Sequence, residues 1–154
     1  MEKTLAMKVL EGKKVAYEAV IYPDTERDAV EVAQALGVSP AQVFKTLVVT
    51  RPSGKPLLVM LPADRQLDLK QLAQAVGEKK LKMAAHSEAE ALTGLQVGGI
   101  SALALLHRPF AIYLDTAARN YEHIYISAGK RGINLKVGVQ DLVKVTGARW
   151  LESS

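Results

Sequence analysis

The chain has 154 residues, enough for one domain with a single core, and 49% hydrophobic with 23% charged residues is typical of an ordinary soluble globular protein. It contains no cysteine, which excludes disulfides, thiolate zinc sites and a cysteine nucleophile. No apolar run approaches the ~20 residues that cross a bilayer, and charges interrupt the N-terminus, so we expect a cytoplasmic protein with no secretory signal or membrane partner.

The net charge of +4 fits an anionic partner such as RNA, although many enzymes have a similar balance. Aromatic residues are only 5%, which argues against a surface that stacks several single-stranded bases. The three histidines, His86, His107 and His123, lack the spacing of metal ligands. We therefore expect phosphate contacts to any nucleic acid, no metal and no cofactor.

The first predicted helix runs from Asp28 to Leu36, with Asp24 and Thr25 as capping candidates and Gly37 as its stop. The segment "SPAQ" at 39–42 then predicts a short helical turn.

Two strands follow this turn. The segment "VFKTLVV" at 43–49 predicts a strand, and "LLVML" at 57–61 predicts a second one. The residues between them, 51–56, have the composition of a turn. The pair is therefore predicted to be a hairpin with a six-residue connection.

A second helix is predicted from Asp68 to the stop at Gly77, followed by a short strand within 80–84. Ser87 and Glu90 have the spacing of a capping box, which predicts a further short helix.

The segment 97–101 is predicted to be a tight turn or loop. A final helix is predicted from Gln140 to Val145, stopped by Gly147. Between them the alternation predicts four strands, at 103–106, 110–114, 123–127 and 133–137. This order favours an α+β fold, a mixed sheet with helices packed around it, over a doubly wound parallel sheet.

Lys45 is a charged residue on an otherwise apolar strand face, which it shares with Val43, Leu47 and Val49. It could lie on an edge strand, where it reaches water and blocks aggregation. It could equally lie in a pocket wall, where a partly buried cation meets a substrate carbonyl or phosphate. Both interpretations stay open from the strand alone.

Other features also have two interpretations. The glycines at 98–101 could present backbone N–H groups to a ligand oxygen or form a plain turn. The segment "SAGKRG" at 127–132 could be an anion-binding turn or a solvated hairpin tip. Tyr22 and Asp115 could line the same pocket, or pack against the sheet and cap a turn.

Four segments together resemble the YbaK family of aminoacyl-tRNA deacylases, relatives of the editing domain inserted in bacterial prolyl-tRNA synthetase. They run in order over roughly residues 8 to 148, as "ALGVSPAQVFKTLVV" (35–49), "LDLKQLAQAVG" (67–77), "TGLQVGGIS" (93–101) and "YISAGKRGINL" (125–135). The combination of the Lys-Thr-Leu strand with the Ser-x-Gly-Lys-Arg-Gly loop is fairly specific.

The resemblance implies a single editing domain over 1–154, with a strongly curved, barrel-like mixed sheet and flanking helices around one pocket. It also implies hydrolysis of the ester that joins a wrong cysteine or alanine to the 3′ end of tRNA(Pro), or cyclisation through cysteine's own thiol. The expected partners are mischarged tRNA(Pro) and, as an option, prolyl-tRNA synthetase, but not DNA. The alternative is a non-catalytic tRNA- or synthetase-binding module of the same fold.

Lys45 matches the lysine that the family needs for activity. Ala102 stands where the family's glycine loop usually has proline, so we expect a less rigid loop and a broader substrate range. The residues expected to contact the substrate are Tyr22, Gly98, Gly99, Ile100, Ser101, Asp115, Ser127 and Gly129. The tRNA phosphate contacts are expected to be Lys130 and Arg131, with help from Lys79, Lys80 and Lys82 at the rim.

Overall fold

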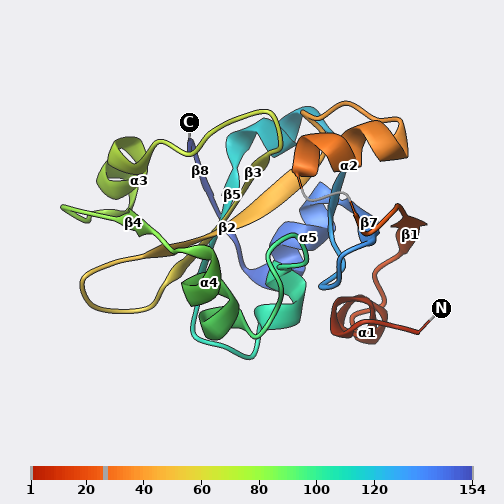
Figure 1. Cartoon of the computed structure of the whole chain (residues 1–154), viewed down its shortest axis with the longest axis horizontal. Helices are drawn as coiled ribbons and strands as arrows, with labels where there is room; N and C mark the ends of the chain where they lie inside the picture. Colours follow the sequence, from red (N-terminus) through yellow and green to blue (C-terminus); the bar gives the residue numbers. More distant parts are fainter. Residues whose placement is uncertain (1, 26–27, 154) are drawn as a thin grey trace.

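The computed structural model describes residues 2–25 and 28–153 (Figure 1). Its strands are β1 (Tyr17–Ile21), β2 (Phe44–Thr50), β3 (Leu57–Pro62), β4 (Lys82–Met83), β5 (Ala111–Asp115), β6 (His123–Ser127), β7 (Ile133–Gly138) and β8 (Arg149–Leu151). Its α-helices are α1 (Leu5–Gly12), α2 (Ala29–Leu36), α3 (Leu69–Val76), α4 (His86–Thr93) and α5 (Val139–Thr146). Two 3₁₀ helices are η1 (Ala102–Leu105) and η2 (Thr116–Asn120).

The strands form two sheets. One is antiparallel with the order β1-β7-β6, and the other is mixed with the order β4-β2-β3-β5-β8. The sheets meet where Val43, just before β2, forms an isolated parallel bridge with Tyr125 of β6. The predicted α+β class with a mixed sheet is confirmed, although the strands form two sheets rather than one, and these do not close into a barrel.

The main core lies between the two sheets, where α1, η1 and α5 pack together. Its large side chains, such as Leu10, Leu103, Leu114 and Leu142, have no exposed surface. Burying one such side chain stabilises the fold by roughly 1.5–3 kcal/mol. This core packs against one side of β2 and β6, so a cavity can form on another side of these strands.

The strongest sequence predictions agree with the structure. The hairpin of β2 and β3 has its connection at 51–56, and α3, β6, β7 and α5 lie close to their predicted places. Helix α2 is also confirmed, but its cap is Asp28 and not residues 24–25. The Asp28 carboxylate accepts a hydrogen bond from the Val30 N–H at 2.7 Å, because it lies directly before the first helical turn.

Two predictions are wrong. The segment 103–106 is not a strand: it lies mostly within η1, whose four residues are all buried, so no alternation of faces exists there. The capping box at 87–90 is absent, since α4 already begins at His86. Glu90 instead accepts a hydrogen bond from the Val97 N–H at 2.9 Å, which ties α4 to the glycine loop. By contrast, the segment 39–42 forms the predicted short turn, in which the Ala41 N–H donates to the Ser39 hydroxyl at 3.2 Å and the Gln42 N–H donates to the Ser39 carbonyl at 3.0 Å.

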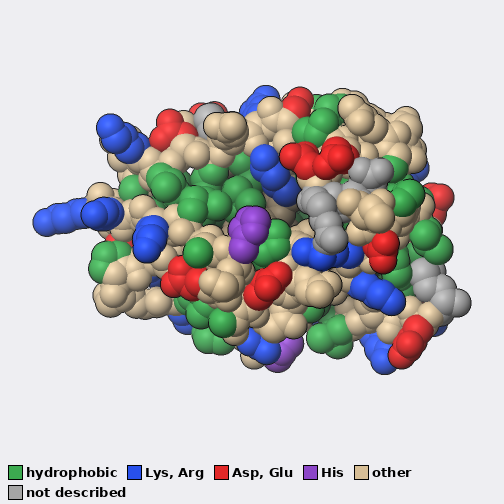
Figure 2. All heavy atoms as spheres, viewed as in Figure 1, with side chains coloured by type: hydrophobic (Ala, Val, Ile, Leu, Met, Phe, Trp, Pro, Cys, Tyr) green, Lys and Arg blue, Asp and Glu red, His purple; other side chains and the backbone are tan. Residues whose placement is uncertain are grey.

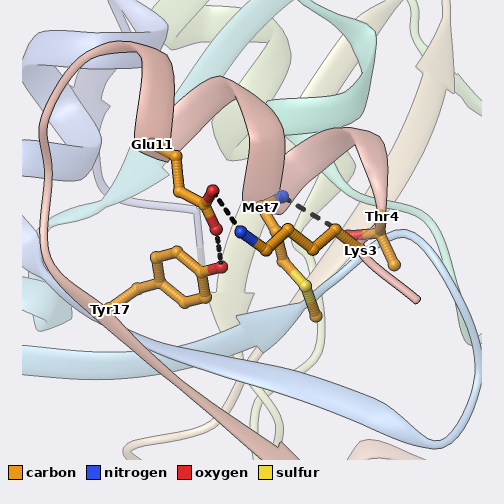
Figure 3. A network of polar contacts seen from close by, with 5 residues as sticks. All are labelled: Lys3, Thr4, Met7, Glu11 and Tyr17. Carbon is orange, nitrogen blue, oxygen red and sulfur yellow. Dashed lines mark hydrogen bonds and ion pairs between the residues drawn. The ribbon is translucent and has the colours of Figure 1, made fainter. Parts of the chain in front are cut away.

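Helix α1 and strand β1 were not among the predicted elements. Thr4 caps α1 by accepting a hydrogen bond from the Met7 N–H (Figure 3). At the end of the helix, Glu11 pairs with Lys3 at 2.7 Å and accepts a hydrogen bond from the Tyr17 hydroxyl of β1. The hydrogen bond to Glu11 raises the pKa of Tyr17 to about 12. This network joins the helix to the edge of the antiparallel sheet.

The glycine loop at 97–101 packs directly against the turn at 127–132. Gly99 is buried, and a Cβ atom there would lie 3.0 Å from the backbone N of Arg131. Arg131 in turn donates a hydrogen bond from Nε to the Val97 carbonyl at 2.7 Å. The two segments are therefore held together by a close backbone approach that only glycine permits, and by one side chain.

This packing predicts that Gly99→Ala lowers the free energy of unfolding by about 1–3 kcal/mol, because the new methyl group meets backbone that has no room to move. Gly12→Ala is the control, since nothing lies within 4 Å of a Cβ at that position in α1. The control should be neutral, or stabilising by up to about 1 kcal/mol. Urea unfolding measures both. Equal stability of the two variants would contradict the role given to Gly99.

Candidate active site

A cavity of about 460 Å³ lies along β2, within the range of about 300–1,000 Å³ common for small-molecule sites. Its walls come from α2, α4, the glycine loop and the beginning of β7, which meet around β2. Figure 2 shows a hollow on this face, with hydrophobic side chains inside it and basic, acidic and histidine side chains around it. The cavity therefore combines an apolar interior with a polar rim.

The cavity exists because β2 has only a partial neighbour on one side. Strand β4 pairs with Val49 and Thr50, and the Ala84 N–H donates to the Val48 carbonyl. Before that point, within the described part of the chain, no strand pairs with this side of β2 until the bridge at Val43. The open stretch of β2 is the part that contains Lys45.

This arrangement resolves the two interpretations of Lys45. The residue does lie on a strand edge, but that edge borders the cavity. Its ammonium group donates a hydrogen bond to the Ala63 carbonyl at 3.3 Å. Burial lowers the pKa of Lys45, while the carboxylates of Asp28 and Asp64 oppose that shift. The cavity wall thus carries a half-buried cation.

Three polar residues line the cavity near the beginning of β7: Tyr22, Ser127 and Asn134. The Tyr22 N–H donates to the Gly132 carbonyl at 2.9 Å, which places this residue beside the 127–132 turn. Burial raises the pKa of the Tyr22 hydroxyl, and hydrogen bonding to the Gly132 backbone and to Asn134 acts in the opposite direction. Asn134 is directly opposite Ser127 in the β6–β7 register.

Of the four glycine-loop residues that were predicted to contact the substrate, two line the cavity. Gly98 and Ile100 line it. Gly99 faces the neighbouring turn, and its N–H donates to the Gln96 carbonyl at 2.8 Å. Ser101 is 1% exposed and lies outside the cavity wall, and its hydroxyl has no hydrogen-bond partner among the described residues. Gly98 and Ile100 are therefore the loop residues that can offer backbone groups to a ligand.

Two further predicted residues lie outside this cavity. Asp115 is 2% exposed, and its carboxylate accepts hydrogen bonds from the Ala117 N–H, the Ser153 N–H and the Ser153 hydroxyl. It therefore fixes the C-terminal residues to the mixed sheet. Gly129 donates its N–H to the Ser127 hydroxyl at 3.1 Å and faces a second groove.

The second groove has a volume of about 520 Å³ and is lined in part by residues 128–130 of the 127–132 turn. Arg131 is not part of the groove wall. Its side chain points elsewhere, since Nε donates a hydrogen bond to the Val97 carbonyl. The predicted rim residues Lys79, Lys80 and Lys82 line neither cavity. The charged or titratable residues of the groove come from three segments: Glu2 and Lys3, His107 and Arg108, and Lys130.

Residues that sequence reasoning missed also line the first cavity, among them Asp28, His86 and Asn134. Asn134 had only a weak signal, because it shares its strand face with Lys136 and the alternation looks like that of an ordinary half-exposed strand. Asp28 was visible only as the start of a helix, and His86 had no signal at all. Their positions depend on how α2 and α4 approach β2.

Across residues 2–25 and 28–153, no three His, Asp or Glu side chains gather where they could hold a metal ion. Within the same ranges, the helices are too short or too polar to cross a membrane.

Comparisons with known proteins support the resemblance to aminoacyl-tRNA deacylases that was found in the sequence. Residues 23–145 match the family described as an aminoacyl-tRNA editing domain. A protein of Enterococcus faecalis, provisionally named a Cys-tRNA(Pro)/Cys-tRNA(Cys) deacylase, EbsC, is 35% identical over 98% of this chain and 93% of its own length. A proline–tRNA ligase of Thermodesulfovibrio yellowstonii is 35% identical over 78 residues, which are 51% of this chain and 13% of the ligase.

A similar fold is found among solved structures. The crystal structure of a protein provisionally described as a trans-editing enzyme for prolyl-tRNA synthetase has a TM-score of 0.85 and 26% identity, and the match covers 97% of this chain and 94% of the other. The family match, the relative that is similar over almost its whole length and the similar fold all indicate the same family. The chain belongs to the aminoacyl-tRNA editing domain family.

Proposed function

We propose that this chain is a trans-editing aminoacyl-tRNA deacylase, which removes a small, wrongly attached amino acid, cysteine or alanine, from tRNA(Pro). The observation that carries the proposal is the half-buried ammonium of Lys45 on the wall of a cavity in a chain of this family. The relative from Enterococcus faecalis, whose provisional name assigns it Cys-tRNA(Pro), supports the choice of substrate.

The geometry fits hydrolysis of an ester. Water attacks the carbonyl carbon, and the carbonyl oxygen gains negative charge that Lys45 and the N–H groups of Gly98 and Ile100 stabilise. The bond to the ribose oxygen then breaks, and a proton from the attacking water passes to that oxygen, so that the ribose leaves as its hydroxyl. For cysteine, its own thiol would attack instead: a C–S bond closes a cyclic thioester, the bond to the ribose oxygen breaks, and the thiol proton passes to that oxygen. An aminoacyl ester is already activated, so positioning and charge stabilisation suffice without a side-chain nucleophile.

The alternative is a module that binds tRNA or a synthetase without turnover. Incubation of the purified chain with mischarged tRNA(Pro) separates the two functions. Release of the amino acid above the spontaneous rate supports the deacylase, whereas tRNA binding without release supports the module.

Lys45→Ala should lower the rate of deacylation by about 10²-fold or more, because the charge aimed at the developing oxyanion is lost. Lys45→Arg should remain strongly impaired, since a planar guanidinium does not replace a compact ammonium. Single-turnover deacylation of Ala-tRNA(Pro) measures both.

Lys70→Ala is the matched control, because Lys70 is exposed on α3 and lies outside the cavity. It should retain the full rate. Circular dichroism should show that all three variants stay folded. A fully active Lys45→Ala variant would contradict the catalytic role.

Lys130 and Arg131 should differ in tRNA binding. Lys130 is exposed in the second groove, so Lys130→Gln should weaken binding and lower the slope of log K against log salt by about one. Arg131→Gln should mainly lower stability, because the bond to the Val97 carbonyl is lost. Filter binding at several salt concentrations and urea unfolding measure these effects. A salt slope unchanged by Lys130→Gln would exclude a phosphate contact there.

The cavity should favour small amino acids. Large side chains collide with its walls, but one methylene changes the binding free energy by only about 1–3 kcal/mol, so small residues are poorly separated. We expect fast removal of alanine and cysteine, slower removal of serine and the slowest removal of proline. Deacylation rates on tRNA(Pro) charged with each of the four test this order. Fastest removal of proline would refute an editing function.

A further inference from the structure

Asp28 is the one carboxylate among the residues that line the first cavity in the described ranges. Asp28 is exposed and lies directly before α2, as the cap of that helix. Its position is fixed, because Oδ1 accepts the hydrogen bond from the Val30 N–H and Glu31 closes the capping box from the other side. The cap accounts for one oxygen and leaves the second oxygen as a potential acceptor for a ligand.

The proposed substrate has a matching requirement. An aminoacyl ester carries a positively charged α-amino group, two bonds from the carbonyl carbon that is attacked. If Lys45 contacts the carbonyl oxygen, two cations must lie close together in a half-buried site. Like charges repel strongly where water is scarce, so a carboxylate nearby is needed to hold the α-ammonium.

We infer that Asp28 binds the α-ammonium group of the aminoacyl moiety, and so restricts the site to esters whose α-amino group is free. The inference rests on the proposed deacylase function and names the feature of the substrate that the site recognises. Asp28 and Lys45 then contact opposite ends of one short N–Cα–C=O unit. Tyr22 and Asn134 remain available for the neighbouring ribose or side chain.

Other carboxylates near the cavity do not fit this role. Asp64 is close enough to act on the charge of Lys45, but it is not part of the cavity wall. Glu90 is outside the wall, and one of its oxygens accepts a hydrogen bond from the Val97 N–H. Asp28 differs from both because it lines the cavity itself.

The consequence is that the site distinguishes esters with a free α-amino group from esters whose α-amino group is acylated. A site with this carboxylate accepts newly charged aminoacyl-tRNA and disfavours esters with an acylated amino group, such as peptidyl-tRNA. An acylated nitrogen is neutral and keeps only one N–H, so it loses the charge attraction to Asp28, and its added acyl group must also find space beside the carboxylate. The discrimination does not depend on the size of the side chain.

The test compares Asp28→Asn with the wild type on Ala-tRNA(Pro) and N-acetyl-Ala-tRNA(Pro). Asn caps helices as well as Asp does, so the variant removes the charge and keeps α2. On the free-amine substrate, kcat/KM should fall by about 10- to 100-fold, as expected for loss of a hydrogen bond between charged groups. On the acetylated substrate, which the wild type already cleaves poorly, the rate should change less than about twofold.

Asp64→Asn is the matched control, because it removes a carboxylate that acts on Lys45 from outside the cavity. Any effect it has should be the same for both substrates. If Asp28→Asn also slows both substrates equally, Asp28 acts only through Lys45 and the inference is wrong. Absence of any deacylation by the wild type would instead refute the proposed function, so the two failures are distinguishable.

A measurement on the wild type alone covers the case in which the variant does not fold. Lactyl-tRNA(Pro) has a hydroxyl in place of the α-ammonium and is otherwise the same size as the alanyl ester. The wild type should cleave it at least about 10-fold more slowly, after correction for the spontaneous rate of each ester. Equal corrected rates would overturn the inference.

Discussion

The close approach between the glycine loop at 97–101 and the turn at 127–132 is the contact on which the cavity depends. Gly99 has no room for a side chain against the backbone of Arg131, and the Arg131 side chain holds the Val97 carbonyl. The turn joins two strands of the antiparallel sheet, while the loop follows α4, which stands against the mixed sheet. One contact therefore fixes the distance between walls that belong to different sheets.

Inside this cavity, Lys45 is neither fully buried nor fully exposed. A fully buried lysine tends to lose its proton, and a fully exposed one is hydrated and stabilises an oxyanion weakly. Half-burial lowers the pKa of Lys45, and the carboxylates of Asp28 and Asp64 counteract the loss of charge. The open edge of β2 makes this balance possible, because a neighbouring strand there would have filled the space.

Under the proposed function, the charges of the two cavities would divide the recognition of an aminoacyl-tRNA. The first cavity offers one cation, one carboxylate and an apolar interior, which suits a short amino acid ester. The second groove offers Arg108 and Lys130, which suit phosphate groups, although Glu2 also lines it. Ser127 lines the first cavity and residues 128–130 line the groove, so a ligand that spans both would contact the 127–132 turn along its length.

Local signals in the sequence were enough to predict the 44–62 hairpin, the helices that end at Gly37 and Gly77, and the exceptional position of Lys45. These signals are turn composition, helix stops and side-chain alternation, and each lies within a few residues. Tertiary structure alone decided which side chains share the cavity, bringing in Asp28 and leaving out Asp115. The reason is physical: which face of an element borders a cavity depends on packing between segments far apart in the chain, which local periodicity does not encode.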